Sequence, residues 1–257
     1  FTTSHKAGIY VSHDAGLTWQ HLASTYTNTI TFRRWRTVNA IAPDPAHQGV
    51  LLSGSRQNGL WRSADSGQSW MQVYTAPLTS APLFHQYEDD PPNPHPAPVL
   101  HVAFHPVVST TVYAALDGFG VIKSTNSGLA WQLVNSGLPT SPTVQYLAVG
   151  SDDTLYAAVG QAGVYVSGDG GGQWQAANGG LPALDDRAWV SGVAVHPADS
   201  QMAYLSMVTY DDANVWKTTD GGATWTPKGD VTSDPVNNPT EVWSTRGPDG
   251  GYYPYTL

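Results

Sequence analysis

Apolar and polar positions along this chain follow the spacing of short strands rather than that of helices. Five runs of four residues contain β-branched or aromatic side chains, and each begins with Gly or Asn: residues 8–11, 59–62, 120–123, 163–166 and 214–217. A turn residue followed by such a run is typical of a strand. Residues 70–73 and 131–134 then alternate apolar and polar side chains, which predicts another strand after a short turn.

Two further strands are predicted ahead of each of the last four runs. They cover residues 38–43 and 50–54, 101–106 and 111–116, 146–150 and 154–159, and 190–197 and 202–208. The first strand of most pairs is apolar and small, which suits the crowded centre of a radial array. The predicted unit is therefore four antiparallel strands, named A to D in chain order.

The turn between strands C and D repeats five times in the form Ser/Thr-x-Asp/Asn-x-Gly-x-x-Trp, which we call the box. Its tryptophans are Trp19, Trp70, Trp131, Trp174 and Trp225, separated by 43 to 61 residues. Four-stranded units at this period are typical of β-propeller blades. We therefore expect an all-β fold, a β-propeller of four-stranded antiparallel blades.

The repeat spans nearly the whole chain, so we expect one propeller domain over residues 1–257. The predicted blade cores are residues 1–31, 36–75, 99–136, 144–178 and 189–230, with an insert at 75–98. The first blade shows only strands C and D, and the chain opens with Phe1 partway through a repeat. We expect a processed or trimmed chain, or one cut from a longer protein. Strands within 241–257 could close a five-bladed ring; alternatively, these blades belong to a ring of six to eight.

The box resembles the Asp-box, or BNR repeat, of sialidases, sortilin-type receptors, xyloglucan-cleaving hydrolases and photosystem assembly factors. The resemblance covers roughly residues 8–230. It implies a structural motif on the rim away from the ligand face. The motif also has a mechanical explanation, because a short Asp or Asn side chain accepts backbone N–H bonds within a turn and Gly supplies a positive φ. We therefore expect the box carboxylates to be poor catalytic candidates.

The composition excludes several classes of function. The net charge is −9 with 11 basic residues, so nucleic-acid binding through phosphate contacts is not expected. The absence of cysteine excludes a disulfide framework and thiolate metal sites. No apolar run approaches ~20 residues, so no membrane span is expected. We expect no metal and no cofactor, because no phosphate-binding, dinucleotide or calcium-loop pattern is present.

Ligand sites of propellers usually lie at the face formed by the B–C and D–A loops, opposite the boxes. Flat aromatic rings beside polar groups suit sugars, whose C–H faces stack on rings while their hydroxyls take hydrogen bonds. Candidate ligand-binding residues on these loops are Arg34, Trp35, Arg36, Arg56, Asn58, Phe119, Trp189 and Tyr210. The long insert 75–98 is either functional, a surface decoration, or a contact with a neighbouring domain or chain.

Two functional hypotheses follow. The first is an exported or cell-surface propeller, with a periplasmic location as a variant, that binds a glycan or a protein partner through this loop face. The alternative is an Asp-box glycoside hydrolase that uses two carboxylates of the same face, Asp117 with Asp211 or Asp212. A sialidase is disfavoured because its Arg-Ile-Pro motif is missing. A sortilin-type receptor is disfavoured because no cysteine-rich module follows the propeller.

Overall fold

The computed structural model describes residues 2–4, 8–22, 38–56, 59–79, 95–185, 188–209, 214–229, 245–246 and 252–253. Every regular element in these ranges is a β-strand. The described part of the chain therefore holds no helix that is long and apolar enough to cross a membrane.

Most of the described strands form five antiparallel sheets, which we call blades 1 to 5 in chain order. Blade 1 has three strands, β1 (Thr2–Ser4), β2 (Gly8–Val11) and β3 (Gln20–His21). Blade 2 contains β4 (Val38–Pro43), β5 (Leu51–Ser55), β6 (Leu60–Ser63) and β7 (Met71–Tyr74). Blade 3 contains β10 (Val99–Phe104), β11 (Val112–Leu116), β12 (Gly120–Ser124) and β13 (Gln132–Leu133). Blade 4 contains β14 (Tyr146–Val149), β15 (Leu155–Ala158), β16 (Val164–Ser167) and β17 (Gln175–Ala176). Blade 5 contains β18 (Trp189–His196), β19 (Asp199–Val208), β20 (Val215–Thr218) and β21 (Thr226–Gly229).

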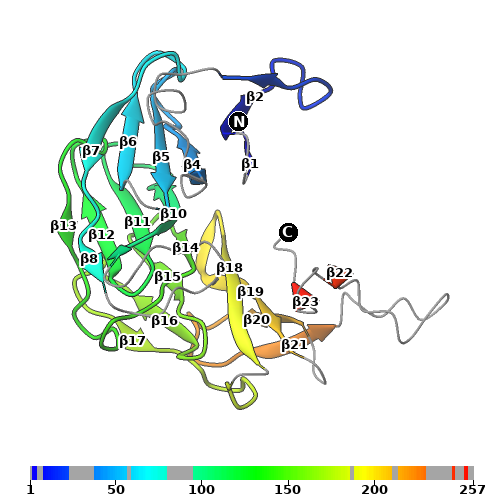
Figure 1. Ribbon diagram of the computed structural model, residues 1–257. Helices are drawn as coiled ribbons and strands as arrows, with labels where there is room; N and C mark the ends of the chain where they lie inside the picture. Colours follow the sequence, from blue (N-terminus) through cyan, green and yellow to red (C-terminus); the bar gives the residue numbers. More distant parts are fainter. Residues whose placement is uncertain are drawn as a thin grey trace.

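The blades follow one another in an arc, with the first strand of blades 2 to 5 on its inner side (Figure 1). Strand β4 contacts β10, β10 contacts β14, and β14 contacts β18. Strands β5, β11 and β15 are buried along their whole length, because each is covered by apolar side chains on both sides. The main apolar clusters lie between successive blades. This is the predicted all-β architecture of four-stranded propeller blades.

Three of the inner strands contain a β-bulge, which the alternation of apolar and polar residues in the sequence does not reveal. Near the start of β4, β10 and β18, the antiparallel register with the next strand of the blade shifts by one residue. The shift falls between Val38 and Ala40, between Val99 and His101, and between Val190 and Gly192. Such a bulge redirects side chains and increases local twist. In these three strands the bulge lies at the end that follows the D–A loop, so it shapes the loop face, whereas β14 pairs with β15 in regular register. Strand β18 has a second shift at its other end, between Val195 and His196.

The structure corrects two details of the predicted strands. Blade 1 has a third strand, β1, paired with β2 through Thr2–Tyr10 and Ser4–Gly8, where only strands C and D were predicted. The insert 75–98 contains two short strands, β8 (Leu78–Thr79) near its start and β9 (His95–Pro96) near its end, which pair with each other. No strand was expected there. Residues 80–94 lie outside the described part of the chain.

The strands predicted within 241–257 are only partly described. β22 (Thr245–Arg246) and β23 (Tyr252–Tyr253) pair with each other as an antiparallel hairpin. The remaining residues of that segment lie outside the described ranges. Ring closure by this segment therefore stays a prediction.

Candidate functional site

The box carboxylates are engaged in holding their own turns. In blade 2 the hydroxyl of Ser63 donates to Asp65 at 2.7 Å, and the backbone N–H of Gly67 donates to Ser63 Oγ at 2.8 Å. The N–H of Ser69 donates to Asp65 Oδ1 at 2.9 Å. Hydrogen bonds from the Ser69 hydroxyl and backbone are the main cause that lowers the pKa of Asp65 to about 2. The side chain of Asn126 accepts the equivalent N–H of Ala130 at 2.8 Å, so the turn needs an acceptor rather than a charge.

The boxes and the A–B turns share one edge of the blades. The N–H of Ser66 donates to the carbonyl of Gly49 at 2.9 Å, and that of Ser127 to Thr110 at 2.8 Å. Blades 4 and 5 repeat this bond from box to A–B turn, from Gly170 to Asp153 and from Gly221 to Gln201. The B–C and D–A loops therefore occupy the opposite edge, where the candidate residues were sought.

Asp117 lies at that opposite edge, immediately after β11. Its side chain is buried, with 3% of the residue exposed. Thr143 Oγ1 donates to Asp117 Oδ1 at 2.7 Å, and the N–H of Asp117 donates to the carbonyl of Pro98 at 2.9 Å. These bonds tie the B–C turn of blade 3 to the two D–A loops beside it. Asp117 is thus a firmly held carboxyl group at the loop face.

Three of the predicted ligand-binding residues are described. Arg56 follows β5 and is 9% exposed. Phe119 is half-buried in the B–C turn of blade 3, where its ring packs against the apolar cluster between blades 2 and 3. Trp189 opens β18 and is half-buried opposite Val208. The remaining candidates lie outside the described residues: Arg34, Trp35, Arg36, Asn58, Tyr210, Asp211 and Asp212.

The structure reveals an aromatic pair that the sequence interpretation missed. His101 of β10 stacks on Tyr146 of β14, with ring centroids 3.8 Å apart and an interplanar angle of 29°. Burial lowers the pKa of His101 to about 4. Its buried Nδ1, like Nε2 of neighbouring Gln145, has no hydrogen-bond partner among the described residues. An alignment of the inner strands would have singled out His101, because the small residues Ala40 and Gly192 occupy its position in blades 2 and 5.

A second missed feature is the pentapeptide Asn-x-Gly-Leu-Pro, at 135–139 and 178–182. Asn135 Oδ1 accepts the N–H of Val121 at 2.8 Å, while its Nδ2 donates to the carbonyl of Phe119 at 2.7 Å. The Gly, for example Gly137 at φ 92°, leaves room for the backbone of the next box, since a Cβ there would lie 2.0 Å from the Trp174 carbonyl oxygen. The motif therefore joins a B–C turn to the following blade.

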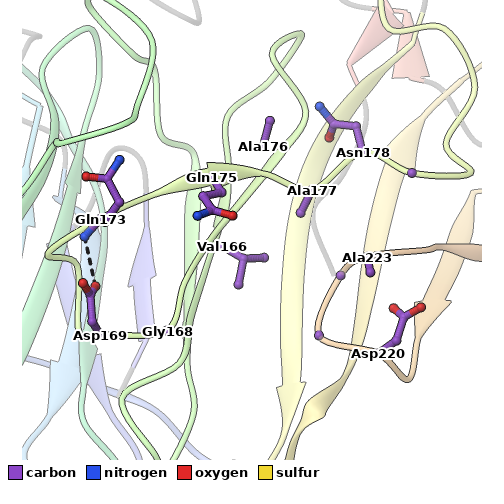
Figure 2. A pocket seen from close by; sticks show the side chains of 13 residues that line it. Val166, Gly168, Asp169, Gln173, Gln175, Ala176, Ala177, Asn178, Asp220 and Ala223 are labelled. Carbon is purple, nitrogen blue, oxygen red and sulfur yellow. Dashed lines mark hydrogen bonds between the residues drawn. The ribbon is translucent and has the colours of Figure 1, made fainter.

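A groove of about 460 Å³ lies between the boxes of blades 4 and 5. Figure 2 shows Asp169 and Asp220 at its lower edge and Gln175 and Asn178 above them. Both carboxylates accept hydrogen bonds within their own boxes. Asp169 accepts the N–H of Gln173 at 2.9 Å, and Asp220 accepts the N–H of Thr224 at 2.9 Å. The groove is on the box side, so it is not the predicted ligand face.

The comparisons with known proteins agree with this architecture. No family model matches the chain. A xyloglucanase of Acetivibrio thermocellus is 26% identical over 248 residues, which cover 86% of this chain and 28% of the relative. The chain thus spans little more than a quarter of the length of that relative.

Solved structures show the same fold. The GH74 xyloglucanase of Xanthomonas campestris matches with a TM-score of 0.59 and 25% identity, over 76% of this chain and 30% of that one. YCF48 from Cyanidioschyzon merolae matches with a TM-score of 0.55 and 17% identity, over 83% of this chain and 61% of that one, which is a likeness of fold alone. The chain is therefore built of β-propeller blades. The likeness to xyloglucanases favours the hypothesis of a glycoside hydrolase over that of a propeller that only binds a ligand.

Proposed function

We propose that this chain forms part of an Asp-box glycoside hydrolase that acts on xyloglucan or a related β-glucan. The observation that carries the proposal is the sequence likeness to a xyloglucanase along 86% of the chain, at 26% identity. The fold likeness to a second xyloglucanase, at 25% identity, supports it.

The glucan binds at the loop face in this proposal. The hydrogen bonds within the boxes support that choice, because they occupy the carboxylates at the other edge. Arg56, Phe119 and Trp189 are the described candidates for contacting sugar rings and hydroxyls at this face. The other candidates are Arg34, Trp35, Arg36, Asn58 and Tyr210.

Hydrolysis would use Asp117 together with Asp211 or Asp212, from the B–C loops of blades 3 and 5. One carboxyl group would protonate the glycosidic oxygen, and the other would attack the sugar or activate water. A separation of about 5 Å would give retention of configuration, and about 6.5–9.5 Å would give inversion. Because Thr143 fixes one oxygen of Asp117 and the residue is only 3% exposed, Asp117 would meet substrate only at the mouth of the B–C turn.

The test is release of reducing ends from xyloglucan, a mixed-linkage β-glucan and a sialoside. We expect turnover of a β-glucan and at least a 100-fold loss of kcat in Asp117→Asn or in one of Asp211→Asn and Asp212→Asn. Asp169→Asn is the matched control, since Asn126 shows that a box accepts an amide. Binding of a glycan without hydrolysis would favour the binding propeller over the hydrolase. The absence of both binding and hydrolysis would contradict both hypotheses.

We further propose that residues 1–257 form one propeller domain located outside the cell or at its surface, where a polymeric glucan is accessible. The insert 75–98 is the candidate contact with a neighbouring domain or chain. Its two ends are held together by the β8–β9 ladder, in which Thr79 lies opposite His95. Deleting 80–94 would test this without cutting the ladder.

A further inference from the structure

The stacked pair His101 and Tyr146 lies where the inner strands of blades 3 and 4 begin, at the end of the blades that carries the D–A loops. Strands β10 and β14 contact each other on the inner side of the arc (Figure 1). His101 pairs with Ala115 and Tyr146 pairs with Ala158, and these alanines close the same Tyr-Ala-Ala sequence in β11 and β15. The two stacked rings therefore occupy equivalent positions of consecutive blades.

The fold does not require an aromatic residue at this position. Ala40 pairs with Gly54 at the equivalent point of blade 2, and Gly192 pairs with Ser206 in blade 5. Neither position carries a ring, yet both blades form the same four-stranded sheet. Tyr146 is 39% exposed, so only part of its ring contributes to packing. This contrast makes the exposed side of the ring a candidate for contact with a ligand.

Two polar groups of the pair and its neighbour point independently to a ligand. The buried atoms His101 Nδ1 and Gln145 Nε2 have no hydrogen-bond partner among the described residues. Such groups are few in native structures, because a buried donor or acceptor without a partner is unfavourable. A Cβ on Gly160 would lie 3.1 Å from Gln145 Nε2, so this amide lies beside the B–C turn of blade 4. A rotation of the Gln145 side chain toward the surface would let the amide donate to a ligand hydroxyl.

The segment 143–146 connects this pair to the candidate carboxylate. Thr143 Oγ1 donates to Asp117 Oδ1 at 2.7 Å and accepts the N–H of Gly118 at 3.3 Å. Tyr146 follows Thr143 by three residues, which span at most about 10 Å. A sugar chain that contacts Asp117 is therefore within reach of the Tyr146 ring.

The chemistry of the pair favours an uncharged ligand over an anion. Burial lowers the pKa of His101 to about 4, so the imidazole against Tyr146 is neutral near pH 7. The amide of Gln145 is neutral as well, and the chain as a whole has a net charge of −9. A pyranose offers C–H groups that can lie on the face of an aromatic ring and hydroxyls that accept from an amide.

We propose that Tyr146 is a platform for one pyranose ring of a neutral glucan, with His101 supporting the ring from behind and Gln145 donating to a sugar hydroxyl. This inference rests on the proposed function, because it takes a glucan chain at the loop face as its starting point. Tyr146 contacts the sugar, whereas His101 is a positioning residue that acts through the stack. The platform selects neutral glucans over chains of uronic acids, since it offers an anion no positive charge.

Titration calorimetry with a xyloglucan oligosaccharide, cellohexaose and a galacturonic acid hexamer tests the platform. The measurements use the Asp117→Asn background, so that the proposed hydrolysis does not consume the probe. We expect Tyr146→Ala to raise the Kd of at least one glucan about tenfold and Tyr146→Phe, which keeps the ring, to change it by less than about twofold. Tyr204→Ala is the matched control, because Tyr204 is equally exposed, at 40%, but lies on blade 5 beside Lys217.

Substitutions of His101 test its positioning role. His101→Ala should weaken glucan binding about threefold or more, and His101→Phe should restore it, with unfolding curves showing that both variants are folded. The proposal is overturned by no binding of either glucan, by an equal Kd in Tyr146→Ala and its parent, or by tighter binding of the galacturonic acid hexamer. Release of reducing ends, measured separately in the Asp117 chain, keeps the two proposals apart. Hydrolysis with unchanged affinity in Tyr146→Ala contradicts the platform alone, and Tyr146-dependent binding without hydrolysis contradicts the hydrolase alone.

Discussion

The indole N–H of Trp225 donates to the carbonyl of Ala177 at 2.8 Å and so joins the box of blade 5 to the residue that follows the last strand of blade 4. Trp174 makes the equivalent bond to Val134, also at 2.8 Å. The indole of Trp70 instead donates to Gly67 within its own box at 3.0 Å. The same box residue therefore connects blades in one half of the chain and closes its own turn in the other.

This difference predicts unequal costs for the same substitution. Trp225→Phe should lower the free energy of unfolding by about 1–3 kcal/mol, because it removes the indole donor from the half-buried Ala177 carbonyl. Trp70→Phe should cost less, since Trp70 is half-buried and its acceptor is a carbonyl of its own turn. Urea unfolding of both variants measures the two values. Equal losses would show that the interblade bond contributes nothing specific.

The boxes also predict a dependence of stability on acid. Hydrogen bonds from Thr18, Ser69 and Thr224 lower the pKa of the box carboxyls Asp14, Asp65 and Asp220 from 3.8 to about 2. A carboxyl whose folded pKa is depressed stabilises the fold fully above its unfolded pKa and loses that contribution as the pH falls through the folded value. The free energy of unfolding should therefore decline between about pH 4 and pH 2.

Reciprocal variants test this origin of the acid sensitivity. Asp65→Asn should flatten the decline, whereas Asn126→Asp should steepen it, because the amide of Asn126 accepts the same backbone bond without titrating. Chemical unfolding at a series of pH values from 2 to 6 gives both slopes. If the slopes of the two variants change in the same direction, the box hydrogen bonds are not the cause.

The strands were predictable because each has a local signature. Residues 38–43 were predicted as a strand and form β4, and the turn residue before Val121 marks β12 as expected. The strand β1 was missed because Thr2–Ser4 is short and polar, and only its pairing with β2 makes it a strand. Pairing of this kind depends on a partner elsewhere in the chain, which a local pattern does not report.

The sequence predicted at which edge of the blades Asp117 lies, but not the surroundings of its side chain. The repeat places Asp117 on a B–C turn, but its burial and its bond from Thr143 depend on how two loops pack. The His101–Tyr146 stack joins residues of two blades at a bulge, and bulges leave little trace in alternation. Contacts between blades thus decide which loop residues are accessible.

His101 predicts a second pH effect, at higher pH than that of the boxes. Burial lowers its pKa from 6.5 to about 4. The unfolded chain therefore takes up a proton that the folded chain refuses, and stability should fall as the pH drops from about 6.5 to 4. His101→Phe keeps a ring against Tyr146 but cannot titrate, so its unfolding free energy should vary less over this range. An unchanged profile in this variant would assign the effect to other groups.

The last prediction concerns the turn that carries the candidate site. Asn135 holds the B–C turn of blade 3 from both sides, by accepting from Val121 and donating to the Phe119 carbonyl, two residues from Asp117. Asn135→Ala should cost about 1–3 kcal/mol of unfolding free energy and loosen the turn, since both bonds are lost.

Asn178→Ala is its matched control, because Asn178 makes the same pair of bonds in blade 4, to Val164 and Ala162, where the turn carries no candidate carboxylate. If Asp117 contributes to the proposed hydrolysis, Asn135→Ala should lower kcat/KM on the glucan by about tenfold more than Asn178→Ala, at a temperature where both variants remain folded. Equal activities with equal losses of stability would assign Asn135 a purely structural role and weaken the case for Asp117. Steady-state rates measured beside unfolding curves separate the two outcomes.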